Sequence, residues 1–241
     1  MSMTRSCAAV LLGLVLVGCS GREATSPASD ASATEPGRGP AGGTPARDDD
    51  RAGQPRIVFL GDSLTAGYGL DLADAVPSRI QRRLETEGYA YQVVNAGVSG
   101  DTSAGGRSRL EWALDAEGGR PEVLVIELGA NDGLRGLPVS QLRENLEAII
   151  TTARGRGIDV ILTGMEAPPN YGAAYTQEFR QVYRDLADAH DVVFVPFYLE
   201  GVAGIPSLNI QDGIHPNADG TRIIEETIWR ALEPVLEKHD R

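Results

Sequence analysis

The sequence predicts an α/β fold, a three-layer α/β/α sandwich in which helices cover both faces of a five-stranded parallel sheet. The alternation of two kinds of segment along the chain predicts it. Short apolar segments rich in β-branched or aromatic residues alternate along the chain with longer amphipathic segments. Alternation at this spacing is typical of βαβ units, whose crossovers make the sheet parallel. No internal repeat is visible, so we expect a single α/β domain.

The expected strands and helices follow one another from residue 56 onward. The strands are residues 56–60, 91–95, 123–128, 159–163 and 192–196. The helices, which carry an apolar face at helical spacing, are residues 76–87, 106–116, 139–154, 175–190 and 218–237.

The first 55 residues have a different composition from the rest. A short start with Arg5 precedes eleven apolar residues, 7–17. This run is too short to span a bilayer as a helix, which takes ~20 residues, but it matches the apolar core of a secretory signal peptide. Residues 20–55 have no hydrophobic period, so we expect a flexible linker. The predicted parts are a lipoprotein signal peptide (1–18), a lipidated cysteine with a disordered linker (19–55) and the folded domain (56–241).

The end of the signal segment, Leu16-Val17-Gly18-Cys19, resembles the bacterial lipobox. Cleavage there would leave Cys19 as the first residue, carrying acyl chains that anchor the protein, since each buried methylene contributes ~0.8 kcal/mol. With Ser20 next, we expect a secreted lipoprotein held on a membrane, the outer membrane facing the periplasm. Cys7 would be removed, so no disulfide can form within the mature chain.

Net charge and residue spacing argue against two kinds of partner, nucleic acid and calcium. The formal net charge is -12, which argues against nucleic acid, because phosphate binding requires clustered Lys and Arg. The acidic run at residues 47–51 lacks the ligand spacing of a calcium loop. We expect a monomer.

Three short, polar turns follow the first three predicted strands. They are residues 61–64, 96–101 and 129–132. Ligands bind at the carboxyl ends of parallel strands, so these turns would gather on the reactive edge of the sheet. Ser63 lies in the first of them and is the candidate nucleophile.

A serine needs a neighbouring base, and the chain has only three histidines. His239 lies in the charged tail, and His190 ends a predicted helix, where a cation complements the helix dipole. His215 precedes the last helix, and Asp212 lies three residues before it. That carboxylate can accept the Nδ1 hydrogen and leave Nε2 facing Ser63. The alternative is a helix-capping aspartate beside an incidental histidine.

Catalysis by a serine also needs donors for a developing oxyanion. The backbone N–H groups of Ser63 and Gly100 and the side-chain amide of Asn131 are candidates. Glycine at position 100 would let the backbone approach the substrate closely. Asn131 taken alone could be a turn residue. Asp62 is expected to orient the turn or cap the following helix.

Taken together, these motifs resemble those of the SGNH (GDSL) hydrolase superfamily. Residues 61–64 are the Gly-Asp-Ser-Leu signature, and Gly100, Asn131 and Asp212-x-x-His215 supply the remaining blocks in order. The resemblance runs from about residue 57 to residue 236. It is nearest to the periplasmic bacterial thioesterase, arylesterase and lysophospholipase subgroup, through residues 61–67, 99–103, 127–136, 170–172 and 212–217.

The resemblance implies a flavodoxin-like sheet and a serine esterase that forms an acyl-enzyme. Its substrate would be a small-molecule acyl ester or lipid, with a carboxylic ester of the acyl, aryl or lysophospholipid type, and thioesters are a further substrate class. It implies Ser63 as nucleophile, His215 as base, Asp212 as its orienter, and an oxyanion hole from Ser63, Gly100 and Asn131. It implies no metal and no organic cofactor. The lipid anchor and linker depart from the soluble relatives resembled here.

Two other functions compete with this interpretation. An acetyl esterase acting on polysaccharide or cell wall would use the same residues. Aromatic residues make up only 5% of the chain, and Trp112 and Trp229 are expected in the core. A non-catalytic ligand-binding lipoprotein would not need a complete set of catalytic residues. Residues 133–138 and 167–175 are expected to shape the pocket, while acyl-chain length and head group stay open.

Replacement of Cys19 tests the predicted anchor. The wild-type protein should incorporate a fatty-acid analogue during growth and sediment with membranes, because acyl chains on Cys19 hold it there. Cys19→Ser should be unlabelled and recovered in the soluble fraction. Cys7→Ser, which changes only the segment to be cleaved, is the matched control and should behave as wild type. Unaltered membrane retention of Cys19→Ser would point to a different anchor.

Overall fold

The structure, a computed structural model, describes residues 53–116 and 118–239. The expected signal peptide, the lipidation of Cys19 and the linker up to residue 52 lie outside the described residues, so they stay predictions. Within the described ranges, no helix combines the length and the apolarity that crossing a membrane requires.

Five strands form one parallel sheet, which confirms the predicted fold class. β1 (Arg56–Gly61) is hydrogen-bonded between β2 (Gln92–Gly97) and β3 (Pro121–Glu127). β4 (Asp159–Thr163) and β5 (Val193–Val195) complete the order β2-β1-β3-β4-β5. The strand ends differ from those predicted by no more than two residues.

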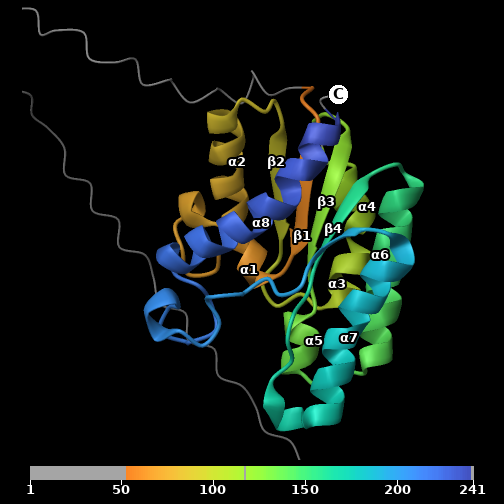
Figure 1. Cartoon of the computed structure of the whole chain (residues 1–241), viewed down its shortest axis with the longest axis vertical. Coiled ribbons are helices and arrows are strands. Elements are labelled where there is room, and N and C mark those ends of the chain that lie inside the picture. The colour runs from red at the N-terminus through yellow and green to blue at the C-terminus, as the bar shows by residue number, and fades with distance from the viewer. Residues whose placement is uncertain (1–52, 117, 240–241) are drawn as a thin grey trace, which may run out of the picture. The chain divides into compact units, whose positions relative to one another are not determined.

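The sheet is covered by helices on both faces (Figure 1). α2 (Val76–Glu87) and α8 (Ala218–His239) pack together on one face, and α6 (Val139–Gly155) and α7 (Ala173–His190) pack together on the other. Every residue of β1 is therefore buried, as is most of β3 and β4. Burial on both faces explains why these strands are continuous apolar runs in the sequence.

The single helix predicted over residues 106–116 is wrong. The structure has two short helices there, α3 (Ser103–Ser108) and α4 (Leu110–Leu114). They are separated at Arg109, whose φ of -111° and ψ of 8° are not those of an α-helix. Thr102 caps α3 by accepting a hydrogen bond from the Gly105 N–H, so this helix begins earlier than predicted.

The two tryptophans differ in their surroundings. Trp229 is buried, as expected, but the placement of Trp112 in the core is wrong because 69% of it is exposed. Trp112 lies on α4, where Leu110, Ala113 and Leu114 are buried. In a helix these three positions share one face, and position 112 lies on another, so Trp112 faces outward.

The strand order places a topological switch beside β1. The chain leaves β1 for β2 on one side and then crosses back to β3 on the other. Ligand sites of parallel sheets lie at such a point, outside the carboxyl ends of the strands. The loops there carry the short helices α1 (Ser63–Ala66), α5 (Ala130–Leu134), η2 (Leu72–Asp74), η3 (Pro169–Tyr171) and η4 (Pro206–Leu208).

Candidate active site

Ser63 is the first residue of α1, directly after the end of the central strand β1. Asp62 caps this helix, as predicted: its Oδ1 accepts a hydrogen bond of 3.0 Å from the Leu64 N–H. Gly67 ends α1 with a φ of 80°, a conformation that favours glycine. The turn therefore holds Ser63 at the edge of the sheet where the carboxyl ends of the strands emerge.

His215 and Asp212 come from the loop that precedes α8. The Asp212 carboxylate accepts hydrogen bonds from the Ile214 N–H at 3.0 Å and the His215 N–H at 3.1 Å, both through Oδ1. Its other oxygen, Oδ2, lies 2.7 Å from His215 Nδ1. The hydrogen bond with the His215 side chain, followed by that from Ile214, lowers the pKa of the Asp212 carboxyl to about 2. Asp212 is therefore an anion at neutral pH.

The structure brings His215 and Ser63 together, with His215 Nε2 2.9 Å from Ser63 Oγ. An ionised carboxylate can only accept hydrogen bonds, so the His215 ring hydrogen belongs on Nδ1, toward Asp212. Nε2 is then free to accept the hydroxyl proton of Ser63. This is the geometry required for activation of a serine by a neighbouring base.

Gly100 lies in a turn after β2, closed by a hydrogen bond of 3.1 Å from the Asp101 N–H to the Val98 carbonyl. Its φ is 86°, so backbone conformation is what calls for glycine here, since an added Cβ would meet nothing closer than 3.9 Å. Within the described residues, neither the Gly100 N–H nor the Ser63 N–H donates a hydrogen bond. Both donors are available to a ligand.

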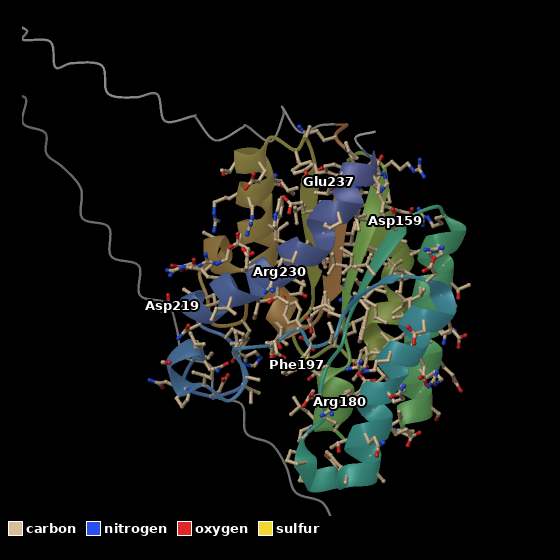
Figure 2. The ribbon with its side chains drawn as sticks, in the orientation of Figure 1. Asp159, Arg180, Phe197, Asp219, Arg230 and Glu237 are labelled. Carbon is tan, nitrogen blue, oxygen red and sulfur yellow. The ribbon has the colours of Figure 1, made fainter. Side chains whose placement is uncertain are left out.

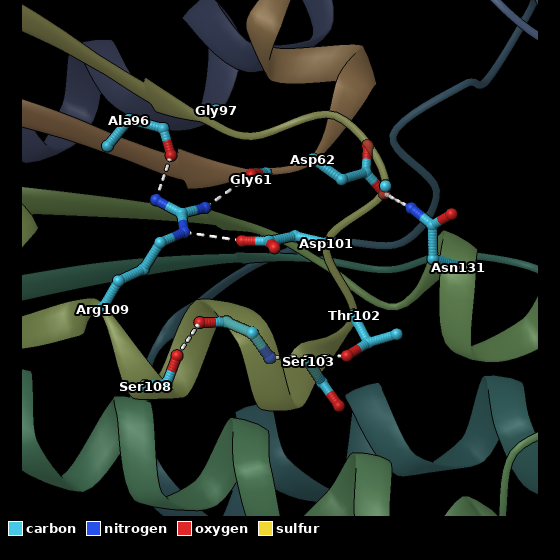
Figure 3. Close-up of polar contacts among 12 residues, drawn as sticks. Gly61, Asp62, Ala96, Gly97, Asp101, Thr102, Ser103, Ser108, Arg109 and Asn131 are labelled. Atoms are coloured by element: carbon cyan, nitrogen blue, oxygen red, sulfur yellow. Dashed lines mark hydrogen bonds and ion pairs between the residues drawn. The ribbon is translucent and has the colours of Figure 1, made fainter. Parts of the chain in front are cut away.

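Asn131 lies in α5, after β3, and its Nδ2 donates a hydrogen bond of 3.1 Å to Asp62 Oδ2 (Figure 3). A carboxylate partner fixes the orientation of the amide, because only the nitrogen can donate. An amide nitrogen carries two hydrogens, so one remains for a ligand. The bond also joins the loop after β3 to the turn that carries Ser63.

Sequence reasoning missed Glu127, at the end of β3. Its Oε2 accepts hydrogen bonds from Thr65 Oγ1 at 2.8 Å and from the Asp62 N–H at 3.3 Å, beneath the turn of Ser63. Burial, and then the neighbouring Asp62 carboxyl, raise the pKa of Glu127 well above its usual range. Burial also raises the pKa of Asp62 to about 6, although hydrogen bonds from Leu64 and Asn131 oppose that shift. Glu127 is therefore the member of the pair that keeps a proton.

Asp132 was also missed. This buried side chain accepts hydrogen bonds from the Ser103 N–H at 2.8 Å and from Ser103 Oγ at 2.5 Å. It joins the start of α3 to α5, and so links the segments that contain Gly100 and Asn131. An Asn-Asp pair in a polar turn carries no signal for such a contact, because the partner is 29 residues away.

Ser63, His215, Gly100 and Asn131 all line one cavity of about 770 Å³. Its other walls are largely apolar and include Leu134, Met165, Ala167, Phe197, Leu199 and Ile214. The two segments expected to shape the pocket contribute Leu134 and Ala167, and the loop after β5 supplies a third wall that was not expected. Tyr68 also lines the cavity, and its ring lies 4.6 Å from the His215 ring between centroids.

The other two histidines lie elsewhere. His190, at the end of α7, is 3.7 Å from Glu147 through Nε2. His239, at the end of α8, is 3.0 Å from Asp159 Oδ2, at the start of β4 and so at the opposite edge of the sheet from Ser63. In the described part of the chain, no three His, Cys, Asp or Glu side chains cluster as metal ligands would.

A serine paired with a histidine and an aspartate at the carboxyl edge of a parallel sheet, beside unpaired N–H donors, defines a serine hydrolase of the α/β class. The family model described as the GDSL-like Lipase/Acylhydrolase family matches residues 59–223. The chain belongs to this family, and it is an SGNH-type serine esterase.

Curated and solved relatives agree with this assignment. Esterase TesA of Pseudomonas aeruginosa is 44% identical over 75% of this chain and 89% of its own. Thioesterase 1/protease 1/lysophospholipase L1 of Escherichia coli is 35% identical over 76% of this chain and 86% of its own. The psychrotrophic esterase EstA of Pseudoalteromonas, in a structure inhibited by monoethylphosphonate, is 31% identical over 76% of this chain and 98% of its own, with a TM-score of 0.71.

The buried carboxyl pair predicts how stability depends on pH. The folded chain holds the protons of Glu127 and Asp62 more tightly than the unfolded chain does, so their burial lowers the free energy of unfolding as pH rises from ~4 through their folded pKa values. Glu127→Gln keeps the shape and removes the buried acid. The difference in the free energy of unfolding, Glu127→Gln minus wild type, should therefore become more positive as pH rises from about 5 to 8. Urea titrations should show a change of more than about 1 kcal/mol in this difference.

A surface carboxyl provides the control. Hydrogen bonds from Gln181 and then Arg143 lower the pKa of Asp185, so it is ionised in both the folded and unfolded states across this pH range. Asp185→Asn should leave the pH dependence of unfolding unchanged there. A Glu127→Gln curve parallel to wild type would show that Glu127 is ionised in the folded protein.

Proposed function

We propose that the protein hydrolyses carboxylic esters of apolar acyl groups through an acyl-enzyme on Ser63. The observation that carries this proposal is the continuous contact from Asp212 through His215 to Ser63, with distances of 2.7 and 2.9 Å, at the wall of an apolar cavity. A hydroxyl, a base and an orienting carboxylate in this order are what acyl transfer requires.

The first half of the reaction acylates Ser63. Ser63 Oγ attacks the carbonyl carbon of the ester while its proton moves to His215 Nε2. The carbonyl oxygen becomes an anion, which accepts hydrogen bonds from the N–H groups of Ser63 and Gly100 and from Asn131 Nδ2. When the carbon–oxygen bond to the alcohol breaks, the alcohol takes the proton from His215 and leaves the acyl group on Ser63.

The second half repeats these steps with water. His215 Nε2 takes a proton from a water molecule, whose oxygen attacks the acyl carbon. The same donors stabilise the second oxyanion, and Ser63 Oγ leaves with the proton held by His215. Asp212 stays ionised throughout, because its pKa is about 2, and it stabilises the positive charge that His215 carries in both halves.

The cavity supports an apolar acyl group as the substrate feature that is recognised. Leu134, Met165, Phe197 and Leu199 provide apolar wall, and Phe197 lies in the loop after β5 (Figure 2). Each methylene buried there contributes ~0.8 kcal/mol to binding. An acyl-enzyme can be formed from an ester or a thioester, so we extend the proposal to thioesters and lysophospholipids, substrates named for the Escherichia coli relative.

The predicted lipid anchor would set where these substrates are met. We propose that acylated Cys19 holds the domain on a membrane, the outer membrane facing the periplasm, through the predicted linker up to residue 55. The lipobox resemblance of residues 16–19 supports this location. A tethered domain of this kind would act on amphiphilic esters close to the lipid surface.

An acetyl esterase for polysaccharide is the less favoured alternative. Long sugar chains are bound on extended aromatic platforms. The exposed Trp112 does not line the cavity, whose lining, among the described residues, includes one exposed aromatic ring, that of Tyr68. An acetyl group would also fill little of a cavity of about 770 Å³.

Replacement of Ser63 tests the acyl-enzyme directly. Ser63→Ala should fold normally and lose esterase activity by roughly 10⁴-fold or more, because no hydroxyl remains to be acylated. A fluorophosphonate probe should label the wild-type protein at one site and leave the variant unlabelled, as judged by intact mass. Labelling of Ser63→Ala, or retained activity, would assign the nucleophile to a different residue.

Replacement of Asn131 tests the oxyanion hole. Asn131→Ala removes a donor that is needed in the transition state, so kcat should fall by roughly 10²–10³ with KM nearly unchanged. The same change removes the partner of Asp62 Oδ2, so thermal unfolding should be measured alongside. A change confined to KM would make the amide a contact to the bound substrate only.

A further inference from the structure

Arg109 lies between α3 and α4 and directs its guanidinium to the carboxyl edge of the sheet (Figure 3). Its Nη2 donates to the Gly61 carbonyl at 2.8 Å, its Nη1 to the Ala96 carbonyl at 2.6 Å, and its Nε to Asp101 Oδ2 at 2.6 Å. Only 16% of the side chain is exposed. One guanidinium therefore contacts β1, β2 and the turn after β2.

Two of these three contacts lie close to a predicted oxyanion donor. Gly61 stands two residues before Ser63, and Asp101 directly follows Gly100. The Gly61 carbonyl also accepts a hydrogen bond of 3.0 Å from the Val98 N–H, so β1 and the turn of Gly100 meet at this oxygen. Regular pairing of β1 with β2 ends at Gly61 and Gly97, before either donor is reached.

The N–H groups of Ser63 and Gly100 thus belong to separate loops, beyond the last paired residues of β1 and β2. Their spacing matters, because donors must lie 2.7–3.1 Å from the place where the oxyanion forms. We infer that Arg109 is a positioning residue of the oxyanion hole: it fixes the Gly100 turn against the Ser63 turn through Gly61, Ala96 and Asp101. This inference rests on the proposed function of Ser63 and Gly100.

A guanidinium suits this task and an ammonium does not. Its N–H groups diverge in one plane, so Nε, Nη1 and Nη2 reach three acceptors on different segments at once. A lysine at position 109 would present a single nitrogen on a flexible stem. It could keep the charge beside Asp101, but it could not hold both carbonyls in the same arrangement.

Arg135 supports the same turn from outside. Its Nη2 donates to the Gly100 carbonyl at 2.8 Å, but this side chain is exposed. A hydrogen bond on the surface competes with water and contributes less to rigidity than the shielded contacts of Arg109. Arg109 is therefore the residue whose replacement should loosen the Gly100 turn.

Arg56 offers a matched control at the opposite edge of the sheet. This buried arginine, at the start of β1, also donates to backbone carbonyls: Nη2 to Leu114 at 2.6 Å, and Nε to Gly119. Arg56→Lys should destabilise the fold in the same manner as Arg109→Lys without touching the Ser63 or Gly100 turn. Comparison of Arg109→Lys with Arg56→Lys therefore separates a loss of stability from a loss of positioning of the Gly100 turn.

The experiment compares kcat, KM and thermal unfolding of purified Arg109→Lys, Arg56→Lys and wild type on a soluble aryl ester. Arg109→Lys should lower kcat by about 10- to 100-fold, the effect of a misplacement of about 1 Å, with KM within about 3-fold of wild type. Arg56→Lys should lower the unfolding temperature and keep the wild-type kcat. Asp101→Asn weakens only the contact of Arg109 with Asp101, so it should also lower kcat, by a smaller factor.

A second readout reports on the oxyanion donors alone. A thiocarbonyl sulfur accepts hydrogen bonds more weakly than an oxygen does, so an intact oxyanion hole favours an ester over the matching thionoester. That preference should shrink in Arg109→Lys and persist in Arg56→Lys. A substitution that only reduced the fraction of folded protein would lower the rates of ester and thionoester hydrolysis equally. The ratio of the two rates would then stay unchanged.

The outcomes distinguish this inference from the function on which it rests. If Arg109→Lys and Asp101→Asn keep the wild-type kcat and preference while Ser63→Ala is inactive, Arg109 has a structural role only and the inference is overturned. If Arg109→Lys loses no more kcat than Arg56→Lys does, the inference also fails. Activity of Ser63→Ala would instead overturn the proposed acyl-enzyme, whatever Arg109 does.

Discussion

The reactive edge of this molecule depends on how one buried carboxyl group, Glu127, is held beneath the turn that carries Ser63. Its hydrogen bonds from Thr65 and from the Asp62 N–H secure both sides of Ser63. Removing a carboxyl from water is unfavourable, and a second one, on Asp62, lies beside it. The fold tolerates this by keeping a proton on Glu127. Burial of this carboxyl thus lowers stability at the turn that holds Ser63, the proposed nucleophile.

Polar contacts also hold the other loops at the carboxyl edge of the sheet. Ser63, Gly100, Asn131 and His215 follow different strands, and a parallel sheet brings them to one edge but does not set their spacing within tenths of an ångström. Polar contacts between neighbouring loops do this, from Asn131 to Asp62, from Asp132 to Ser103 and through the Arg109 guanidinium. Donors arranged before the substrate arrives need no reorganisation during the reaction, which is the main source of their effect on rate.

Binding and chemistry are served by different parts of the cavity. Under the proposed function, the apolar walls would contact the acyl group equally in the ground state and in the transition state, so they would set affinity and choice of substrate. The N–H donors and His215 would act on charge that appears only as the reaction proceeds.

The sequence by itself determined the parallel α/β sheet and the identity of the residues that meet at its edge, because alternating apolar segments and short polar turns are local patterns. It did not reveal Glu127, Asp132 or Arg109, each of which bonds to a partner at least 29 residues away in the chain. It also placed one helix where the chain bends at Arg109, and it buried Trp112, which is exposed. Only the tertiary structure decided these, since the bonding of a buried polar group depends on which distant segments pack around it.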